Sequence, residues 1–301
     1  MKTKTPLISI LIPSYNHQSY IAQCINSILF QTYNNFEIIV VDDNSTDESE
    51  KIIKNIKDKK IEFYKNSFNR GMNATLSEAF KHTHGDYIAI TGSDDFFDRY
   101  YLEEFVKFIN AQKEEYTVFY PQIVPVDDNG DILSQKNKTE NKKFPTNNEV
   151  LRELFLHGNT LASPGMIMSR KAAKKIFPLD AGIHQHQDFI MHIQLLFMGE
   201  CAFIPEAITY YCVPTDTNGH MSSNSRKAYK RIEIETPFAL NYFLKHIKTK
   251  EQLENIFGEM LLQYGKPQND TIPYFLSRIA LDSKDNRLLN VWGARTLIEY
   301  L

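Results

Sequence analysis

Short continuous apolar runs alternate with segments of helical apolar spacing over the first 120 residues of the chain. Continuous apolar runs are typical of parallel strands covered on both faces, and helical spacing is typical of helices with one buried face. The runs that predict strands cover residues 7–12, 37–41, 61–64, 87–91 and 117–120. The segments that predict helices cover residues 19–31, 47–56, 73–82 and 101–111. This alternation predicts an α/β fold with a right-handed, mostly parallel sheet.

The pattern changes after residue 120. Residues 125–149 are rich in Asp, Asn, Lys, Thr and Gly, which predicts an exposed connection. Further strands are expected at 166–168 and 207–211, with helices at 149–156 and 188–198, and residues 215–225 form a polar loop. From residue 226 the spacing is helical to the end, with helices expected at 226–247, 250–264, 271–281 and 285–300.

These changes suggest how the chain is divided. We expect a main domain over residues 1–215, with halves 1–120 and 121–215, followed by a helical C-terminal extension over 216–301. Short apolar helices are not stable alone. We therefore expect the extension to pack on the main domain, on a second copy of the chain in a homo-oligomer, or on a surface.

The composition is that of an ordinary globular protein, with 42% hydrophobic and 24% charged residues. A net charge of −3 gives no reason to expect nucleic-acid binding. Three cysteines are too few for a disulfide framework or a zinc cluster. We see no signal peptide and no apolar stretch of transmembrane length, so we expect a cytoplasmic protein.

Two acidic pairs follow predicted strands, Asp42-Asp43 after 37–41 and Asp94-Asp95 shortly after 87–91. Ligands of open α/β sheets gather beyond the carboxyl ends of the strands, so both pairs are expected to line one crevice. Adjacent carboxylates at the end of a buried strand require a cation. Hard oxygen ligands suit Mg²⁺ or Mn²⁺, and a nucleotide diphosphate commonly accompanies such an ion.

Several linked motifs carry a resemblance to a known family. They read ISILIPSYN at 8–16, SILFQTY at 27–33, FEIIVVDDNSTD at 36–47, NRG at 69–71, GDYIA at 85–89 and SDD at 93–95. In this order and spacing they resemble the family 2 glycosyltransferases with the GT-A fold. The resemblance is strong over residues 6–110, weaker over 160–212, and ends at about residue 215.

The resemblance implies a Rossmann-like sheet flanked by helices. It also implies transfer of a sugar from a nucleotide diphosphate donor to an acceptor hydroxyl, with inversion at the anomeric carbon. Residues 1–120 would then bind the nucleotide sugar and residues 121–215 the acceptor.

The same resemblance implies roles for individual residues. Asp43 matches the aspartate that reads the base edge, and Asp95, with Asp94 beside it, matches the ligand of Mn²⁺ or Mg²⁺. Asp188, in the segment His186-Gln187-Asp188-Phe189, matches the catalytic base. The nucleotide contacts implied in this way are Pro13, Ser14, Tyr15, Asn16, Asp43, Asn69, Gly71 and Asp94.

Three positions depart from the family pattern. Gly92 replaces the first acid of the usual Asp-Ser-Asp-Asp motif, which lowers the number of carboxylates on the metal side. Leu76 stands where many relatives carry an arginine, and Cys212 follows Tyr211 where a Tyr-Arg pair is common. The last two changes remove cations that could face the diphosphate.

Each acidic residue also has a structural interpretation. Asp43, Asp94 and Asp95 could be turn or capping residues, and Asp188 could be the N-cap of the helix at 188–198. For these four residues we favour the functional interpretation because the motifs occur together.

Histidines near these acids suggest further contacts. His186 and His220 are candidates for the diphosphate or the acceptor. His184, His186 and His192 near Asp188 raise the idea of a zinc site. Acceptor contact or plain surface histidines fit better, because no Cys or further ligand lies at a spacing that suits zinc.

The substrates are named only by class. The donor expected from the family is a UDP-sugar, the transferred group a hexosyl or N-acetylhexosaminyl group, and the acceptor a glycan or a lipid-linked sugar in polysaccharide biosynthesis. Basic residues flank the first C-terminal helices: Lys227, Lys230, Arg231, Lys245, Lys248 and Lys250. They could form a solvated face, which we favour, or a site of peripheral attachment to the inner face of an anionic membrane.

Two other functions remain open. The departures at Gly92, Leu76 and Cys212 would also suit a catalytically impaired nucleotide-sugar-binding protein of the same fold. A sugar-phosphate nucleotidylyltransferase ranks third, because that class needs a Gly-rich, basic loop near the N-terminus and residues 12–16 are neither.

Overall fold

The computed structural model describes residues 5–133, 146–213, 225–284 and 286–301. The chain forms two compact units. The first consists of Met1–Asn141, Leu161–His184 and Met198–Asp216, and the second of Lys142–Thr160, Gln185–Phe197 and Thr217–Leu301. The chain thus returns to the first unit twice before it ends in the second. The division at residue 215 suggested by the sequence stays a prediction.

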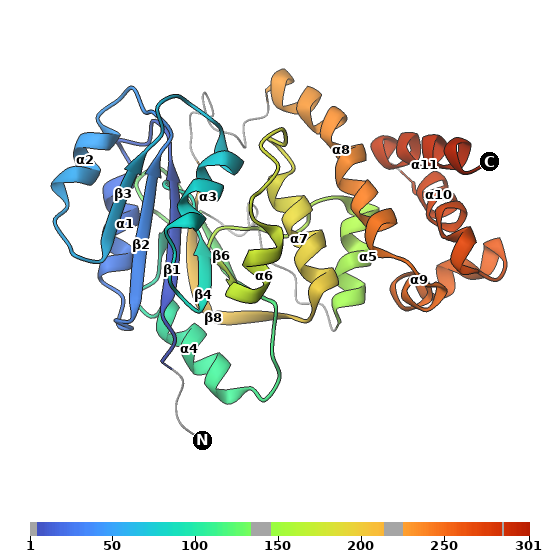
Figure 1. The fold of residues 1–301 in the computed structure, drawn as a ribbon, viewed down its shortest axis with the longest axis horizontal. Helices are drawn as coiled ribbons and strands as arrows, with labels where there is room; N and C mark the ends of the chain where they lie inside the picture. Colours follow the sequence, from blue (N-terminus) through green and yellow to red (C-terminus); the bar gives the residue numbers. More distant parts are fainter. Residues whose placement is uncertain (1–4, 134–145, 214–224, 285) are drawn as a thin grey trace. The chain divides into compact units, whose positions relative to one another are not determined.

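The first unit is built on a sheet whose described strands have the order β3-β2-β1-β4-β7-β6-β8-β5 (Figure 1). Strands β3, β2, β1 and β4 are parallel neighbours, β7 is antiparallel to β4 and β6, and β6 is parallel to β8. The strands are β1 (Ile8–Ser14), β2 (Phe36–Asp42), β3 (Ile61–Lys65), β4 (Tyr87–Ile90), β5 (Phe96–Phe97), β6 (Val118–Val126), β7 (Met166–Ser169) and β8 (Cys201–Cys212). The expected α/β fold with a mostly parallel sheet is confirmed.

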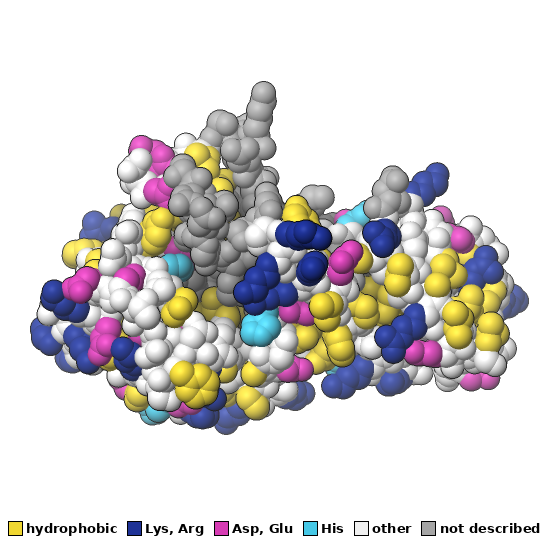
Figure 2. All heavy atoms as spheres, turned by 90° about the horizontal axis from the view of Figure 1, so that it is seen from above, with side chains coloured by type: hydrophobic (Ala, Val, Ile, Leu, Met, Phe, Trp, Pro, Cys, Tyr) yellow, Lys and Arg dark blue, Asp and Glu magenta, His cyan; other side chains and the backbone are white. Residues whose placement is uncertain are grey.

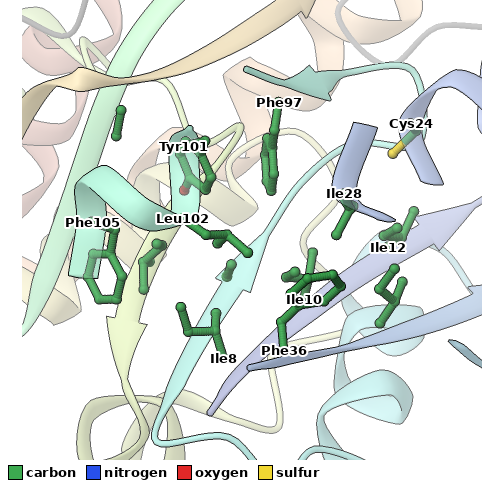
Figure 3. Close-up of a cluster of buried hydrophobic side chains, with 14 of the residues drawn as sticks. Ile8, Ile10, Ile12, Cys24, Ile28, Phe36, Phe97, Tyr101, Leu102 and Phe105 are labelled. Atoms are coloured by element: carbon green, nitrogen blue, oxygen red, sulfur yellow. The ribbon is translucent and has the colours of Figure 1, made fainter. Parts of the chain in front are cut away.

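Helices pack on this sheet through their apolar stripes. The helices of the first unit are α1 (Ile21–Leu29), α2 (Ser49–Asn55), α3 (Met72–Lys81), α4 (Tyr101–Ala111) and α6 (Arg170–Ile176). Helices α1 and α4 share one buried cluster with β1, and α3 packs on β1 and β2 (Figure 3). The labelled members of the cluster are Ile8, Ile10, Ile12, Cys24, Ile28, Phe36, Phe97, Tyr101, Leu102 and Phe105.

Strand register brings the sites predicted from the sequence to one edge of the sheet. Ser14, at the end of β1, pairs with Asp42, at the end of β2, and Leu11 of β1 pairs with Ile90, the last residue of β4. The turns that follow β1, β2 and β4 therefore leave the sheet on the same side. This is the edge at which ligands of open α/β sheets bind.

The second half of the sheet differs from the sequence expectation. Strand β6 continues through Pro121 and Pro125 into the segment predicted as an exposed connection. Proline is rare within sheets, and here a register shift against β8 lies between Pro121 and Gln122. Strand β5 and helix α6 were not predicted, and β8 is longer than its apolar run. Most of the predicted loop at 215–225 lies outside the described residues.

The second unit is helical, as expected. Its elements are α5 (Asn147–His157), α7 (Gln187–Met198), α8 (Arg226–His246), α9 (Lys250–Phe257), the 3₁₀ segments η2 (Gly258–Tyr264) and η3 (Asn269–Thr271), α10 (Ile272–Asp282) and α11 (Arg287–Tyr300). Phe155 of α5 makes edge contacts with Phe243, Phe257 and Trp292, at centroid distances of 5.0, 5.1 and 5.6 Å. The C-terminal helices therefore share a core with α5.

One predicted helix ends early. Residues 258–264 form a 3₁₀ segment instead of continuing α9, because Gly258 has φ 49° and stops the α-helix. None of the described helices combines the length and apolar character that a bilayer-spanning helix requires.

Candidate functional site

Two asparagines shape the turns beyond β1 and β2. Asn16 and Asn44 have φ values of 54° and 63°, a left-handed conformation that asparagine tolerates better than most residues. The Asn16 N–H donates to Ser45 Oγ at 2.9 Å, and Asn16 Oδ1 accepts from the Thr46 N–H at 2.8 Å. These bonds tie the two turns together, so they form one wall of the candidate site.

The predicted nucleotide loop is half buried. Pro13 and Ser14 end β1 inside the sheet, whereas Tyr15 and Asn16 are exposed. Ser14 Oγ is buried and has no hydrogen-bond partner among the described residues. Of the four predicted residues, Tyr15 and Asn16 are therefore the ones with exposed side chains, and the ligand contacts of all four stay a prediction.

Asp43 joins the end of β2 to the start of α3. Its carboxylate is 4% exposed and accepts the backbone N–H groups of Arg70 and Gly71, both at 2.8 Å. Asn66 Nδ2 donates a third bond at 2.7 Å. A carboxylate has about four acceptor positions, so one remains for a ligand. Asp43 thus sets the position of residues 66–71, and its role at the base edge stays a prediction.

The start of α3 depends on Gly71. Its φ of 84° and ψ of 164° lie in a region that is nearly restricted to glycine. The ring of His184 lies 3.5 Å from the position that a Cβ of Gly71 would take, so the imidazole packs against this turn. Asn69, the other predicted residue here, is exposed on the surface before the turn.

The carboxylates beyond β4 converge. A Cβ at Gly92 would lie 2.5 Å from Asp94 Oδ1 and 2.7 Å from Asp95 Oδ2, so the two acids approach one point. Asp95 is 3% exposed, and its Oδ1 accepts the Cys212 N–H at 3.1 Å. Burial raises the pKa of Asp95 well above its usual range, and the charge of Asp94 raises it further. A cation at this point would relieve both effects.

The donor set fits a hard divalent ion. Asp94 and Asp95 offer carboxylate oxygens at the same edge as the predicted nucleotide loop, and such oxygens suit Mn²⁺ or Mg²⁺. His17 reaches the same turn: its Nδ1 lies 2.7 Å from Ser93 Oγ and 4.0 Å from Asp94 Oδ1. The imidazole therefore helps to fix the turn that carries the acids.

Asp127 and Asp128 are acids of this region that sequence reasoning missed. Burial raises the pKa of Cys212 to about 12, and the charges of Asp94, Asp128, Asp95 and Asp127 add to the effect in that order. The Tyr20 hydroxyl donates to Asp128 Oδ1 at 2.7 Å, which raises the pKa of Tyr20. The signal was the Asp-Asp-Asn-Gly turn directly after β6, hidden because residues 125–149 were interpreted as one connection.

A second carboxylate–histidine group lies elsewhere in the first unit. Glu37, Glu62 and His84 have potential ligand atoms within 4.8 Å of one another. Glu37 is near the start of β2 and is separated from Asp43 by the length of the strand. This group therefore does not belong to the candidate site.

Asp188, the predicted base, belongs to the second unit and lies in the first turn of α7. Its Oδ1 accepts the Phe189 N–H at 2.8 Å, and the side chain of Asn159 bonds to the same carboxyl group. Burial raises the pKa of Asp188 to about 6, and the hydrogen bonds oppose this shift only in part. A carboxylate with such a pKa is well matched to proton abstraction near neutral pH.

The predicted histidines are not brought together as a metal site. His184 belongs to the first unit and His186 to the second, and His220 lies outside the described residues. His192 is fully buried, which lowers its pKa to about 3 and keeps it neutral in the core. No group of three potential ligands that includes these histidines occurs among the described residues.

Comparison with known proteins adds an independent finding. A family model described as "Glycosyl transferase family 2" matches residues 9–177, which is more than half of the chain. The chain belongs to glycosyl transferase family 2.

Curated relatives of this family 2 chain cover most of its length. An uncharacterized glycosyltransferase of Methanocaldococcus jannaschii is 28% identical over 287 residues, 94% of this chain and 95% of the relative. The Escherichia coli protein WfaP is 28% identical over 254 residues, 80% of this chain and 95% of the relative. Its name is UDP-Glc:alpha-D-GlcNAc-diphosphoundecaprenol beta-1,3-glucosyltransferase.

Solved structures show the same fold. The crystal structure of Staphylococcus aureus TarS residues 1–349 aligns with a TM-score of 0.58 at 18% identity, covering 97% of this chain and 88% of that chain. The complex of the same TarS fragment with UDP-GlcNAc aligns with a TM-score of 0.57 at 17% identity, with the same coverage. The GT-A-type sheet with C-terminal helices, expected for this family 2 chain, is confirmed.

Two of the three departures from the family 2 pattern, Gly92 and Leu76, have local structural reasons. A side chain at Gly92 would displace both converging carboxylates from their positions. Leu76 of α3 is 2% exposed, and the charged side chain of an arginine at this position would have to leave the core. Cys212 holds Asp95 through its backbone N–H, a contact that any side chain at this position could keep.

Proposed function

We propose that this family 2 chain is an inverting glycosyltransferase that moves a sugar from a UDP-sugar to a hydroxyl of a glycan or lipid-linked acceptor. The observation that carries the proposal is the convergence of Asp94 and Asp95 at the sheet edge that also holds Tyr15, Asn16 and Asp43. A buried acid with a raised pKa beside a second acid calls for a cation, and a nucleotide diphosphate needs one too.

Two similar proteins support a UDP-sugar donor. The relative WfaP is named for a UDP-glucose donor, and TarS has been crystallised with UDP-GlcNAc. We infer a UDP-sugar with a hexosyl or N-acetylhexosaminyl group for this chain. Tyr15 is exposed beside the turn of Asn16 and can stack on the base, while Asp43 has one acceptor position left for the base edge.

The chain's own residues would perform three tasks. Asp94 and Asp95 would hold Mn²⁺ or Mg²⁺, which would supply Lewis-acid stabilisation of the leaving diphosphate. Asp188 would accept the proton of the attacking hydroxyl, since its raised pKa makes it a competent base near neutral pH. The turns tied by Asn16 and Ser45 would align the donor for in-line displacement.

The acceptor and the location are inferred from the relatives and the surface. WfaP acts on GlcNAc-diphosphoundecaprenol, a lipid-linked sugar. We infer a similar acceptor for this chain, within polysaccharide biosynthesis, and a cytoplasmic protein that attaches to the inner face of the membrane. The C-terminal helices would serve attachment or assembly into a homo-oligomer.

Calorimetry and mass spectrometry test this proposal. UDP-GlcNAc and UDP-glucose are titrated into the protein with and without Mn²⁺, and products are sought with GlcNAc-diphosphate linked to a short polyprenol. Asp95→Asn is expected to remove metal-dependent donor binding, because a charged hard ligand becomes a neutral amide. Asp131→Asn, at an exposed acid of the first unit, is the matched control and should bind normally.

Two results would change the conclusion. Unchanged, metal-dependent binding in Asp95→Asn would remove the metal assignment. Donor binding without any transfer to acceptor would favour the catalytically impaired nucleotide-sugar-binding protein instead.

A further inference from the structure

A buried carboxylate of α8 holds the segment that leads into α7. Glu235 is 5% exposed, and its Oε2 accepts the backbone N–H groups of Gln185 at 2.7 Å and His186 at 2.9 Å. Hydrogen bonds from N–H groups to a charged carboxylate are stronger than neutral ones. The two residues before α7 are therefore fixed by a side chain that lies about 50 positions later in the sequence.

The next residue of α8 fixes the imidazole of His186. Thr236 Oγ1 donates its single proton to Ile232 O at 2.7 Å, so its oxygen accepts from His186 Nε2 at 2.9 Å. Burial lowers the pKa of His186, which keeps the ring neutral with its proton on Nε2. Backbone and side chain of His186 are thus both held by α8.

These contacts determine where α7 begins. The Ile190 N–H donates to His186 O at 3.0 Å, which is the first turn of the helix. The N–H groups at a helix start lack partners in the helix, and a negative charge there is favourable. Asp188 stands in this turn, two residues after His186, so its carboxyl group follows any movement of the segment.

Helix α8 also packs against the C-terminal end of α7. Phe197, near the end of α7, makes an edge contact with Phe243 at 5.9 Å and stacks on His246 at 5.1 Å. Side chains of α8 therefore contact both the segment that leads into α7 and the last turn of α7. Because a displacement of about 1 Å in a catalytic group can cost about 10²-fold in rate, this alignment matters for a base.

We propose that Glu235, assisted by Thr236, is a positioning residue that sets the place and the buried environment of Asp188. The inference rests on the proposed function, in which Asp188 is the base. It gives the first helix of the C-terminal region a part in the chemistry, whereas the sequence suggested only packing on the main domain, on a second copy or on a surface for this region.

Glu235→Ala is expected to lower sugar transfer about 10- to 100-fold while leaving the affinity for UDP-GlcNAc with Mn²⁺ unchanged. The rate should also change its dependence on pH. In the unchanged protein the rate is expected to rise with pH through about 6, as Asp188 loses its proton. A released segment admits water to Asp188, so its pKa falls and the rising limb moves to lower pH.

The same helix offers a matched control. Glu233 is exposed two residues earlier, and Glu233→Ala removes the same charge without touching residues 185–186. Glu235→Gln keeps one acceptor oxygen and should lose less activity than the alanine variant, which provides a test if Glu235→Ala does not fold. Hydrogen–deuterium exchange of residues 183–192 should accelerate in both Glu235 variants and not in Glu233→Ala.

The possible outcomes distinguish failure of the base assignment of Asp188 from failure of the positioning role of Glu235. If Asp188→Asn keeps normal transfer, the base assignment of the proposed function fails. If Asp188→Asn is inactive but the Glu235 variants keep the normal rate and the normal pH limb, the positioning role fails. Lower activity in the Glu235 variants, without a shift in the rising limb of the pH–rate profile, would also overturn the positioning role. A purely structural contact would give that result.

Discussion

At the scale of single residues, burial raises the pKa of two acids that are candidates for function. Asp188 and Asp95 both have raised pKa values, first of all because burial disfavours their charged forms. For Asp188 the pKa of about 6 lies inside the range in which most proteins can be studied. The carboxyl group therefore has a measurable signature that does not require a known acceptor.

The stability of the protein should carry this signature of Asp188. Between pH 4 and 6 the folded state binds the Asp188 proton more tightly than the unfolded state does. The stabilisation from this group is therefore complete below pH 4 and is lost as pH rises through 6, with a slope of at most about 1.4 kcal/mol per pH unit. Asp188→Asn should lack this slope.

Denaturant unfolding of both proteins at pH 4 to 7 provides the measurement. The control is Asp131→Asn, whose stability should follow the unchanged protein at every pH. Parallel curves for Asp188→Asn and the unchanged protein would contradict the raised pKa.

At the scale of elements, Asp43 connects strand β2 to helix α3. Asp43→Ala leaves the partly buried N–H groups of Arg70 and Gly71 without their acceptor, at about 1 kcal/mol for each lost hydrogen bond. We expect a clear loss in melting temperature and weaker UDP binding even without metal. Differential scanning fluorimetry and calorimetry with UDP in EDTA measure the two effects.

Asp43→Asn is the informative companion variant. Asparagine keeps one oxygen for the backbone of the 66–71 segment, so stability should fall less than in Asp43→Ala. Weakened UDP binding only in the presence of Mn²⁺ would contradict a role at the base edge.

The elements also mark the limits of sequence-based prediction. The parallel strands β1, β2 and β4 could be predicted because their apolar runs are nearly continuous, and the acidic pairs were found because they follow β2 and β4. Only the start of β6 was predicted, at 117–120. Its continuation to Val126 was not, since Pro121 and Pro125 are signals against a strand and the bulge that admits them depends on β8. Asp127 and Asp128 were missed for the same reason.

The contact of Glu235 with residues 185–186 had no signal in the sequence. Glu235 lies in a segment with alternating acids, and only tertiary packing distinguishes it from the exposed Glu233. The C-terminal helices could be predicted as helices, but not as partners of α5 and α7. Long-range pairing of this kind is set by packing, not by local pattern.

At the scale of the whole molecule, the exposed side of α8 is the surface that would carry the proposed membrane attachment. Lys227, Lys230, Ile234, Phe238 and Lys245 lie on this side, and Ile234 and Phe238 are 65% and 57% exposed. In Figure 2, basic and hydrophobic side chains are interspersed on the part of the molecule that contains the C-terminal helices. Basic residues flanking exposed apolar ones suit the surface of an anionic bilayer.

We expect the protein to co-sediment with vesicles of phosphatidylglycerol and phosphatidylcholine, and less so as salt increases. Lys227→Glu with Lys230→Glu should reduce binding at least several-fold, because each charge near the surface contributes about 1 kcal/mol. The control is Lys51→Glu with Lys107→Glu, which reverses two exposed charges of the first unit. Equal loss in both double variants would point to net charge alone.

The interleaving of the two units has a consequence for anyone who recombines this enzyme with its relatives. Segments 142–160, 185–197 and 217–301 belong to one unit but are separated in the chain. A hybrid made with a single crossover near residue 215 would combine the last helices of one parent with α5 and α7 of the other. Helix α7 would then meet a foreign residue in place of Glu235. Chimeras that are meant to keep this unit intact should therefore move all three segments together.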